Sequence, residues 1–193
     1  SNTLRILEHN IYDLIDNVDN ISFEKIDEIA IKLNIDKYDD NRLKACIIYM
    51  MKQNVYKNGD IYIKRDDLIK KVNYYLRLEI DSNSFDSYFE QLIDENKIVI
   101  EADRYYLTDI YEDEIVVADK IHYLIKKEKT KYSNLKDMVN QMEGLHGIKY
   151  NIKQKEAIVK ALENNILIIT GGPGTGKTTI IKAITNLYQK INN

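Results

Sequence analysis

The sequence predicts a mainly helical protein that passes, near its C-terminal end, into the beginning of an α/β nucleotide-binding domain. Three observations lead to this prediction. Apolar residues recur at helical spacing along most of the 193 residues. Strand-like runs are short and few. Four of the seven glycines and the single proline lie between Gly171 and Gly176, so flexible backbone is concentrated in one loop.

The first 36 residues predict two short helices joined by a tight turn. Apolar residues at helical spacing occur in TLRILEHNIYDLI at Leu4, Leu7, Ile11 and Leu14. Ser22 can cap a second helix that begins at Phe23. The pair resembles a helix-hairpin-helix, a module that holds DNA phosphates through the N–H groups of a glycine-containing hairpin. Asn20 and Ser22 occupy the glycine positions, which hinders close approach to a phosphate, so DNA contact and a purely structural role both stay open.

Residues 37–107 predict a winged helix with a small β-hairpin. The expected elements are a helix over 39–56, a strand over 61–63, helices over 65–76 and 81–96, and a hairpin about 102–104. In a winged helix that reads DNA, the third helix usually enters the major groove. Here that helix carries five carboxylates and no Lys or Arg, and phosphate repels such a surface. We therefore favour packing or contact with a protein partner for this acidic N-terminal half.

Residues 108–149 predict connecting helices between this region and the C-terminal segment. One helix is expected over 108–127 and a shorter one from Ser133 to Gly144. Gly144 and Gly147 mark the expected boundary, because glycine favours turns between elements. The predicted domains are thus 1–36, 37–107, 108–149 and 150–193.

The C-terminal segment predicts a strand, a phosphate-binding loop and a helix. Ile166 to Thr170 is a branched apolar run, as expected for a strand buried on both faces. The loop matches G-x-x-x-x-G-K-[ST], and the candidate nucleotide contacts are Gly171, Gly172, Pro173, Gly174, Thr175, Gly176, Lys177, Thr178 and Thr179. Glycines let successive backbone N–H groups surround an anion at the start of the helix. We expect ATP as ligand, with Lys177 as the catalytic residue at the β- and γ-phosphates and Thr178 as a Mg²⁺ ligand.

Composition limits the other classes of function. The net charge of −3 conceals an asymmetry, because residues 1–118 carry 15 Lys and Arg against 25 Asp and Glu, whereas residues 119–193 carry 13 against 6. The basic half is therefore the half expected to attract phosphates. No apolar run is long enough to span a membrane. A single cysteine, Cys46, lies in an apolar helical stretch, which indicates a buried thiol and a cytoplasmic location.

The segment IKQKEAIVKALENNILIITGGPGTGKTTIIKAI resembles the start of the motor core in RecD-like (RecD/TraA-type) superfamily 1 DNA helicases of the long form. The resemblance implies a RecA-like ATPase domain and gives Gln154 the role of contacting adenine. Gln154 could also complete a capping box at the start of its helix, and the two roles are compatible. The order of helical pair, winged helix and motor also resembles this family, some members of which are named exodeoxyribonuclease V alpha subunit.

The resemblance implies ATP hydrolysis coupled to 5′→3′ movement along single-stranded DNA, in recombination or repair. The motif lies near the end of the chain, and the partner strands of an ATPase sheet do not follow it. We therefore expect a truncated piece of a helicase, which alone binds nucleotide weakly and does not hydrolyse it. Two other hypotheses stay open: a regulatory P-loop ATPase with a winged-helix sensor, and a non-catalytic scaffold that docks a protein.

Overall fold

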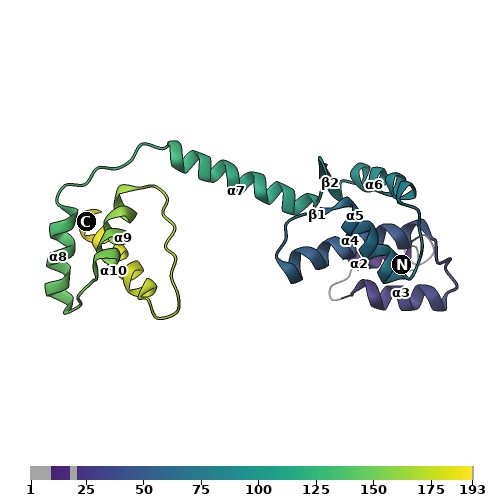
Figure 1. The fold of residues 1–193 in the computed structure, drawn as a ribbon, viewed down its shortest axis with the longest axis horizontal. Helices are drawn as coiled ribbons and strands as arrows, with labels where there is room; N and C mark the ends of the chain where they lie inside the picture. The colour runs from purple at the N-terminus through teal and green to yellow at the C-terminus, as the bar shows by residue number, and fades with distance from the viewer. Residues whose placement is uncertain (1–9, 18–20, 193) are drawn as a thin grey trace. The chain divides into compact units, whose positions relative to one another are not determined.

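The structure is a computed structural model that describes residues 10–17 and 21–192. The chain divides into two compact units, residues 1–115 and 116–193. Figure 1 shows the course of the chain through each unit. No helix of the described ranges is both long and apolar enough to cross a bilayer.

The first unit begins with short helical segments around a set of buried aromatic rings. Its first elements are η1 (Ile11–Asp13), α2 (Leu14–Asn17) and α3 (Phe23–Lys32). Ser22 is the N-cap residue of α3, as predicted, although its side chain makes no capping hydrogen bond. Phe23 is buried and stacks on Tyr12 and Tyr49. Leu4, Leu7 and Asn20 lie outside the described residues.

The remainder of the first unit has the predicted order of helix, strand, helix, helix and hairpin. Its elements are α4 (Asp40–Gln53), the π-helical turn η2 (Asn54–Asn58), β1 (Ile63–Lys64), α5 (Arg65–Leu76), η3 (Ser82–Ser84), α6 (Phe85–Asp94), β2 (Ile98–Glu101) and β3 (Arg104–Leu107). The antiparallel sheet has the order β1-β3-β2. The first strand was predicted at 61–63, but only Ile63 and Lys64 pair with β3, through Tyr105 and Arg104.

A nearly buried ion pair connects helices α3 and α4 of the first unit. Arg42 is 7% exposed and donates from Nε to Asp27 Oδ1 at 2.7 Å and from Nη2 to Asp27 Oδ2 at 2.9 Å. Its third nitrogen donates to Lys37 O, and Tyr12 donates to Asp27 Oδ1. This network joins η1, α3 and α4, and the hydrogen bond to Asp27 raises the pKa of Arg42. Cys46 is fully buried nearby, and burial raises its pKa, in agreement with an inert thiol.

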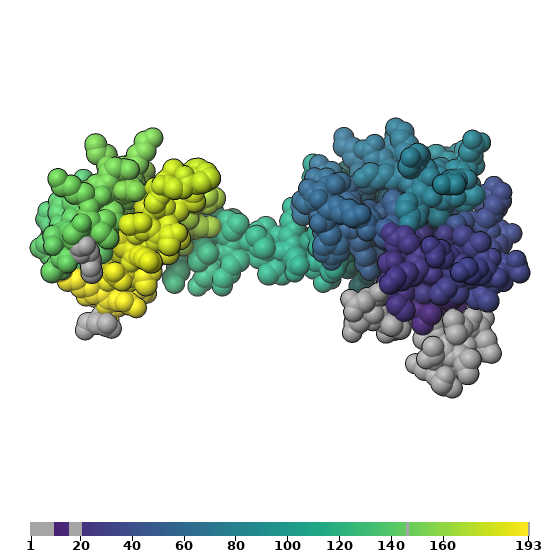
Figure 2. Space-filling view, turned by 90° about the horizontal axis from the view of Figure 1, so that it is seen from below, coloured from purple at the N-terminus to yellow at the C-terminus, as the bar shows by residue number. Residues whose placement is uncertain are grey.

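The second unit is built from three packed helices and the end of a fourth. Helix α7 (Thr108–Lys126) continues directly from β3, and it is followed by α8 (Leu135–His146), α9 (Ile152–Glu163) and α10 (Lys177–Asn192). Helices α8, α9 and α10 share one apolar core formed by Leu135, Val139, Met142, Tyr150, Ile158, Leu162, Ile180, Ala183 and Leu187. Figure 2 shows these helices as one continuous body. The helix predicted from Ser133 to Gly144 instead ends at His146, before Gly147 with φ +64°.

The strand predicted from Ile166 to Thr170 is not formed, which corrects the sequence prediction. This segment runs as an extended connection to one side of the helices (Figure 1). Strand pairing requires a neighbouring backbone, and the strands of the described residues all belong to the sheet of the first unit. Leu167 and Ile168 are consequently 37% and 81% exposed, whereas Ile169 packs on the edge of the helical core.

Candidate functional site

The glycine-rich loop leads directly into helix α10, as the motif predicts. Gly174 and Gly176 have φ values of +73° and +83°, in the left-handed region that favours glycine. At Gly171 an added Cβ would lie 2.8 Å from Thr175 Oγ1, so the loop also approaches itself closely. Helix α10 begins at Lys177, and its N-terminal N–H groups are therefore adjacent to the loop. Such a cradle suits an anion.

The side chains of Lys177 and Thr175 fold back on the loop. Lys177 Nζ donates to the carbonyl oxygens of Gly171 and Gly172, each at 2.7 Å. Thr175 Oγ1 donates to Gly172 O at 2.9 Å. The ammonium group is thereby held at the rim of the loop, where it can transfer its hydrogen bonds from carbonyls to phosphate oxygens. Thr178 is exposed and Thr179 is half-buried at the start of the helix.

Gln154 connects helix α9 to this loop. Its Oε1 accepts from Asn151 N and its own N–H donates to Asn151 Oδ1, both at 2.9 Å, so the capping box predicted as one of its roles is present. Its Nε2 also donates to Thr175 O at 3.2 Å. A Cβ at Gly176 would lie 2.6 Å from the same Nε2. The side chain is therefore fixed beside the phosphate loop, where the adenine contact implied by the resemblance stays a prediction.

Helix α9 is held in place by Glu143 of α8. Glu143 accepts from Tyr150 N and from Lys155 Nζ, both at 2.7 Å, and Lys155 also donates to Asn140 Oδ1. The hydrogen bond from Lys155, followed by that from the Tyr150 N–H, lowers the pKa of Glu143 below its ordinary value. Because Tyr150 immediately precedes the cap residue Asn151, this carboxylate fixes the start of the helix that carries Gln154.

A second anchor joins the approach to the loop with helix α7. Asn165 Nδ2 donates to the carbonyl oxygens of Leu124 and Lys127, at 3.1 and 2.7 Å. Lys129 Nζ donates to Asn164 Oδ1 at 2.9 Å. The last carbonyls of a helix need such partners. The segment leading to the phosphate loop is therefore tied to the C-terminal end of α7 rather than to a sheet.

The residues present fit a nucleoside triphosphate with its metal ion. The loop glycines leave the backbone accessible, Lys177 supplies a positive charge, and the exposed Thr178 hydroxyl is an oxygen donor of the kind that Mg²⁺ prefers. Pro173 is exposed within the same loop. Among the described residues, no group of three or more His, Cys, Asp or Glu side chains could hold a metal ion.

The structure brings together residues that the sequence analysis did not connect. Glu143 contacts Lys155, 12 positions away, and Asn165 contacts Leu124, 41 positions away. Motif spacing gives no signal for such contacts, because they depend on how α8 and α9 pack. Gln154 and Thr175, both candidate nucleotide contacts, are by contrast joined by a direct hydrogen bond.

The loop–helix arrangement is the one that the P-loop motif predicts, and comparisons with known proteins show which families the chain resembles. A model described as "ATP-dependent RecD2 DNA helicase HHH domain" matches residues 1–62, and a model of the AAA domain matches residues 154–193. The chain therefore resembles RecD-like helicases, because it is similar both to this N-terminal domain and to the beginning of the AAA domain.

The similar proteins include one uncharacterized protein and two RecD subunits. The uncharacterized protein MJ1519 of Methanocaldococcus jannaschii is 26% identical over 91% of this chain. The RecBCD enzyme subunit RecD of Buchnera aphidicola subsp. Schizaphis graminum is 33% identical over 60% of the chain, and that of subsp. Acyrthosiphon pisum is 37% identical over 48%. The chain spans 18%, 18% and 15% of the length of these three relatives.

Proposed function

We propose that this chain supplies the ATP-binding loop and an N-terminal accessory module of an ATP-dependent DNA helicase that moves 5′→3′ on single-stranded DNA. The supporting observation is the placement of Gln154 against a glycine loop whose lysine lies at its rim. Relatives named as RecD subunits of the RecBCD enzyme support the helicase assignment and a role in DNA repair. A cytoplasmic location and the designation as an exodeoxyribonuclease V alpha subunit are part of the same proposal.

In this proposal each residue of the site has a defined task. The loop N–H groups and the start of α10 hold the phosphates, and Lys177 neutralises charge at the β- and γ-phosphates. Thr178 ligates Mg²⁺, and the bound metal ion supplies further charge stabilisation. Thr179 and Pro173 complete the wall of the loop. Gln154 contacts adenine while its capping box keeps α9 in register with the loop.

The proposal is tested by nucleotide binding to the purified chain. We expect a fluorescent ATP analogue to bind weakly in the presence of Mg²⁺, and Lys177→Ala to weaken binding by at least about tenfold, because a charge-assisted contact contributes roughly 1.5–3 kcal/mol. Lys182→Ala, on the exposed face of the same helix, is the matched control. Unchanged binding in Lys177→Ala would contradict the proposal.

Activity is tested in a longer protein that contains this chain. There, Lys177→Ala is expected to abolish DNA-dependent ATP hydrolysis and 5′→3′ unwinding. ATP hydrolysis without translocation would instead support a regulatory P-loop ATPase, and absence of specific ATP binding would support a protein-docking scaffold.

A further inference from the structure

Three adjoining hollows follow helix α5 on the surface of the first unit. Lys64, Lys70 and Lys71 line the first, Lys57 and Lys71 the second, and Tyr74 and Arg77 the third. The first and second share Asn54, Asn58 and Lys71, and the second and third share Tyr75. We call this surface the α5 strip and define it by Lys57, Lys64, Lys70, Lys71, Tyr74 and Arg77.

The α5 strip is basic although the surrounding half of the chain is acidic. All five of its Lys and Arg residues are exposed, and the same hollows include three carboxylates, those of Asp60, Asp67 and Glu79. Residues 1–118 as a whole carry ten more acidic than basic side chains. A local excess of positive charge on an acidic unit is complementary to a polyanion and steers it to one place.

A buried amide organises the middle of the strip. Asn54 is 6% exposed and donates to Tyr62 O at 3.0 Å, while its Oδ1 accepts from Lys71 Nζ at 3.0 Å and from Asn58 Nδ2 at 3.3 Å. It begins the π-helical turn η2, which Gly59 ends with φ +78°. π-helical turns are rare and occur frequently at functional sites. The ammonium group shared by the first two hollows is therefore fixed by a buried partner.

Aromatic rings lie beside the charges. Tyr74 is 89% exposed and follows Lys70 by one helical turn on α5. Tyr75 is fixed against Tyr49 and Phe23, with ring centroids 5.4 and 5.8 Å apart. A basic groove that follows a backbone, together with rings on which bases stack, is the usual arrangement for binding single-stranded nucleic acid.

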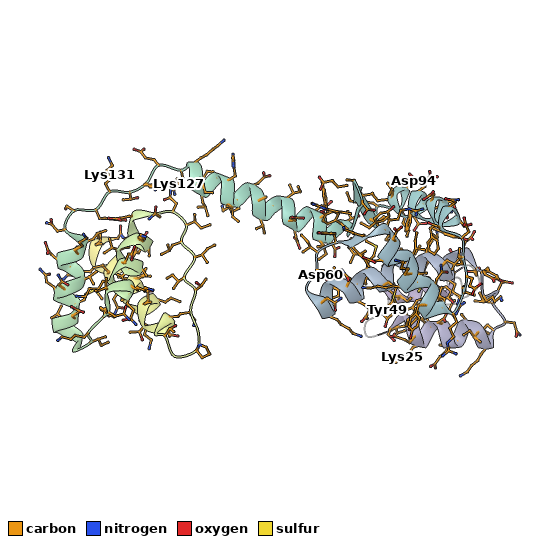
Figure 3. The ribbon with its side chains drawn as sticks, in the orientation of Figure 1. Lys25, Tyr49, Asp60, Asp94, Lys127 and Lys131 are labelled. Atoms are coloured by element: carbon orange, nitrogen blue, oxygen red, sulfur yellow. The ribbon has the colours of Figure 1, made fainter. Side chains whose placement is uncertain are left out.

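We propose that the α5 strip binds single-stranded DNA, with phosphates on its Lys and Arg residues and a base stacked on Tyr74. In this proposal DNA contacts the second helix of the winged helix, α5. The third helix, α6, which usually reads DNA in such domains, is acidic. Asp60 and Tyr49, which border the strip, lie below Asp94 of the acidic helix α6 in Figure 3. The proposal does not depend on the nucleotide site.

The test measures anisotropy of a labelled oligothymidine of about 20 nucleotides with the full chain. The variant Lys57→Gln/Lys70→Gln removes two strip charges, and it spares Lys71, which bonds Asn54. Lys32→Gln/Lys37→Gln removes two exposed charges elsewhere on the unit. We expect only the strip variant to show a weaker salt dependence of DNA binding. The slope of log affinity against log salt concentration should fall by about 0.7 for each lost phosphate contact. The basic second unit contributes equally to both variants.

Stacking is tested by Tyr74→Ala. Tyr38→Ala is the control, because Tyr38 is also exposed, at 49%. We expect at least about a fivefold loss of affinity for Tyr74→Ala only. Photo-cross-linking of iodouracil-containing oligonucleotide is expected to label Tyr74, and equally so in Lys177→Ala, so that failure of the nucleotide site and of the strip are distinguishable. Any one of three results would overturn the proposal. These are equal behaviour of a variant and its control, cross-links confined to residues 116–193, and equal affinity for single-stranded and duplex DNA.

Discussion

Gln154 illustrates at the level of single residues how one side chain completes a helix cap and also contacts a neighbouring loop. Its carbonyl oxygen completes the cap of α9, and its amide nitrogen donates to the phosphate loop. The sequence left capping and ligand contact as two compatible alternatives. The geometry confirms the capping box and places the amide at the loop, because the cap orients the side chain towards Gly176.

Asp27 provides a residue-scale prediction on stability. Asp27→Ala is expected to destabilise the first unit by roughly 3–5 kcal/mol, because it leaves Arg42 buried without its carboxylate partner. Urea denaturation followed by far-UV circular dichroism measures this loss. In the double variant Asp27→Leu/Arg42→Met both charges are replaced, so we expect a much smaller loss. Equal losses in the two variants would contradict this explanation.

Glu143 provides a prediction on pH dependence. Its folded-state pKa lies below the ordinary 4.5, so the stabilisation is present above that value and is lost as the pH falls through the lower folded-state pKa. The unfolding temperature, measured between about pH 7 and pH 3, should therefore fall less steeply with decreasing pH in Glu143→Gln than in the wild type. Glu128→Gln, an exposed carboxylate of the same unit, is the control. The same acid dependence in Glu143→Gln and wild type would contradict the assignment.

At the level of elements, the predicted helices formed where their apolar spacing was regular. Helices α5 and α7 lie close to their predicted ranges. The first short strand was placed less accurately, because β1 consists of two paired residues and its register is set by β3. The apolar run before the loop forms no strand for a related reason, because a strand requires a second backbone segment to pair with.

Asn151 provides a prediction at the element scale. Asn151→Ala is expected to destabilise the start of α9 by about 1 kcal/mol, because the N-cap side chain accepts from Gln154 N. It should also raise amide exchange at Gln154 and in the loop that Gln154 contacts. Asn151→Ser preserves a capping oxygen and should largely restore protection. Hydrogen exchange with mass spectrometry measures both effects, and an increase confined to residues outside α9 and the loop would contradict them.

At the level of the whole molecule, the two units differ in charge and in the sites proposed for them. The first unit carries the sheet of three strands and the proposed α5 strip, and the second carries the glycine-rich loop. Helix α7 belongs to both, since it begins at Thr108 immediately after β3 and its C-terminal carbonyls bind Asn165. Each unit has its own apolar core, so each is expected to respond separately to its ligand.

This separation gives a whole-molecule prediction. Saturating ATP with Mg²⁺ should slow amide exchange in residues 116–193 while leaving residues 10–115 unchanged, because a ligand stabilises only the unit that binds it. The stabilisation should approach about 2.7 kcal/mol when the ligand is present at 100 times its dissociation constant. Lys177→Ala should remove the effect. Equal protection of both units would contradict independent response.

The sequence alone determined the helical class, the order of helices and strands in the first unit and the position of the glycine-rich loop before α10, because each follows from local periodicity or from contiguous residues. Only the tertiary structure decided that Ile166 to Thr170 forms no strand, that Glu143 and Asn165 support the loop, and that the lysines and tyrosines along α5 line one surface. These features depend on contacts between segments far apart in the chain, and such contacts form only when the helices pack.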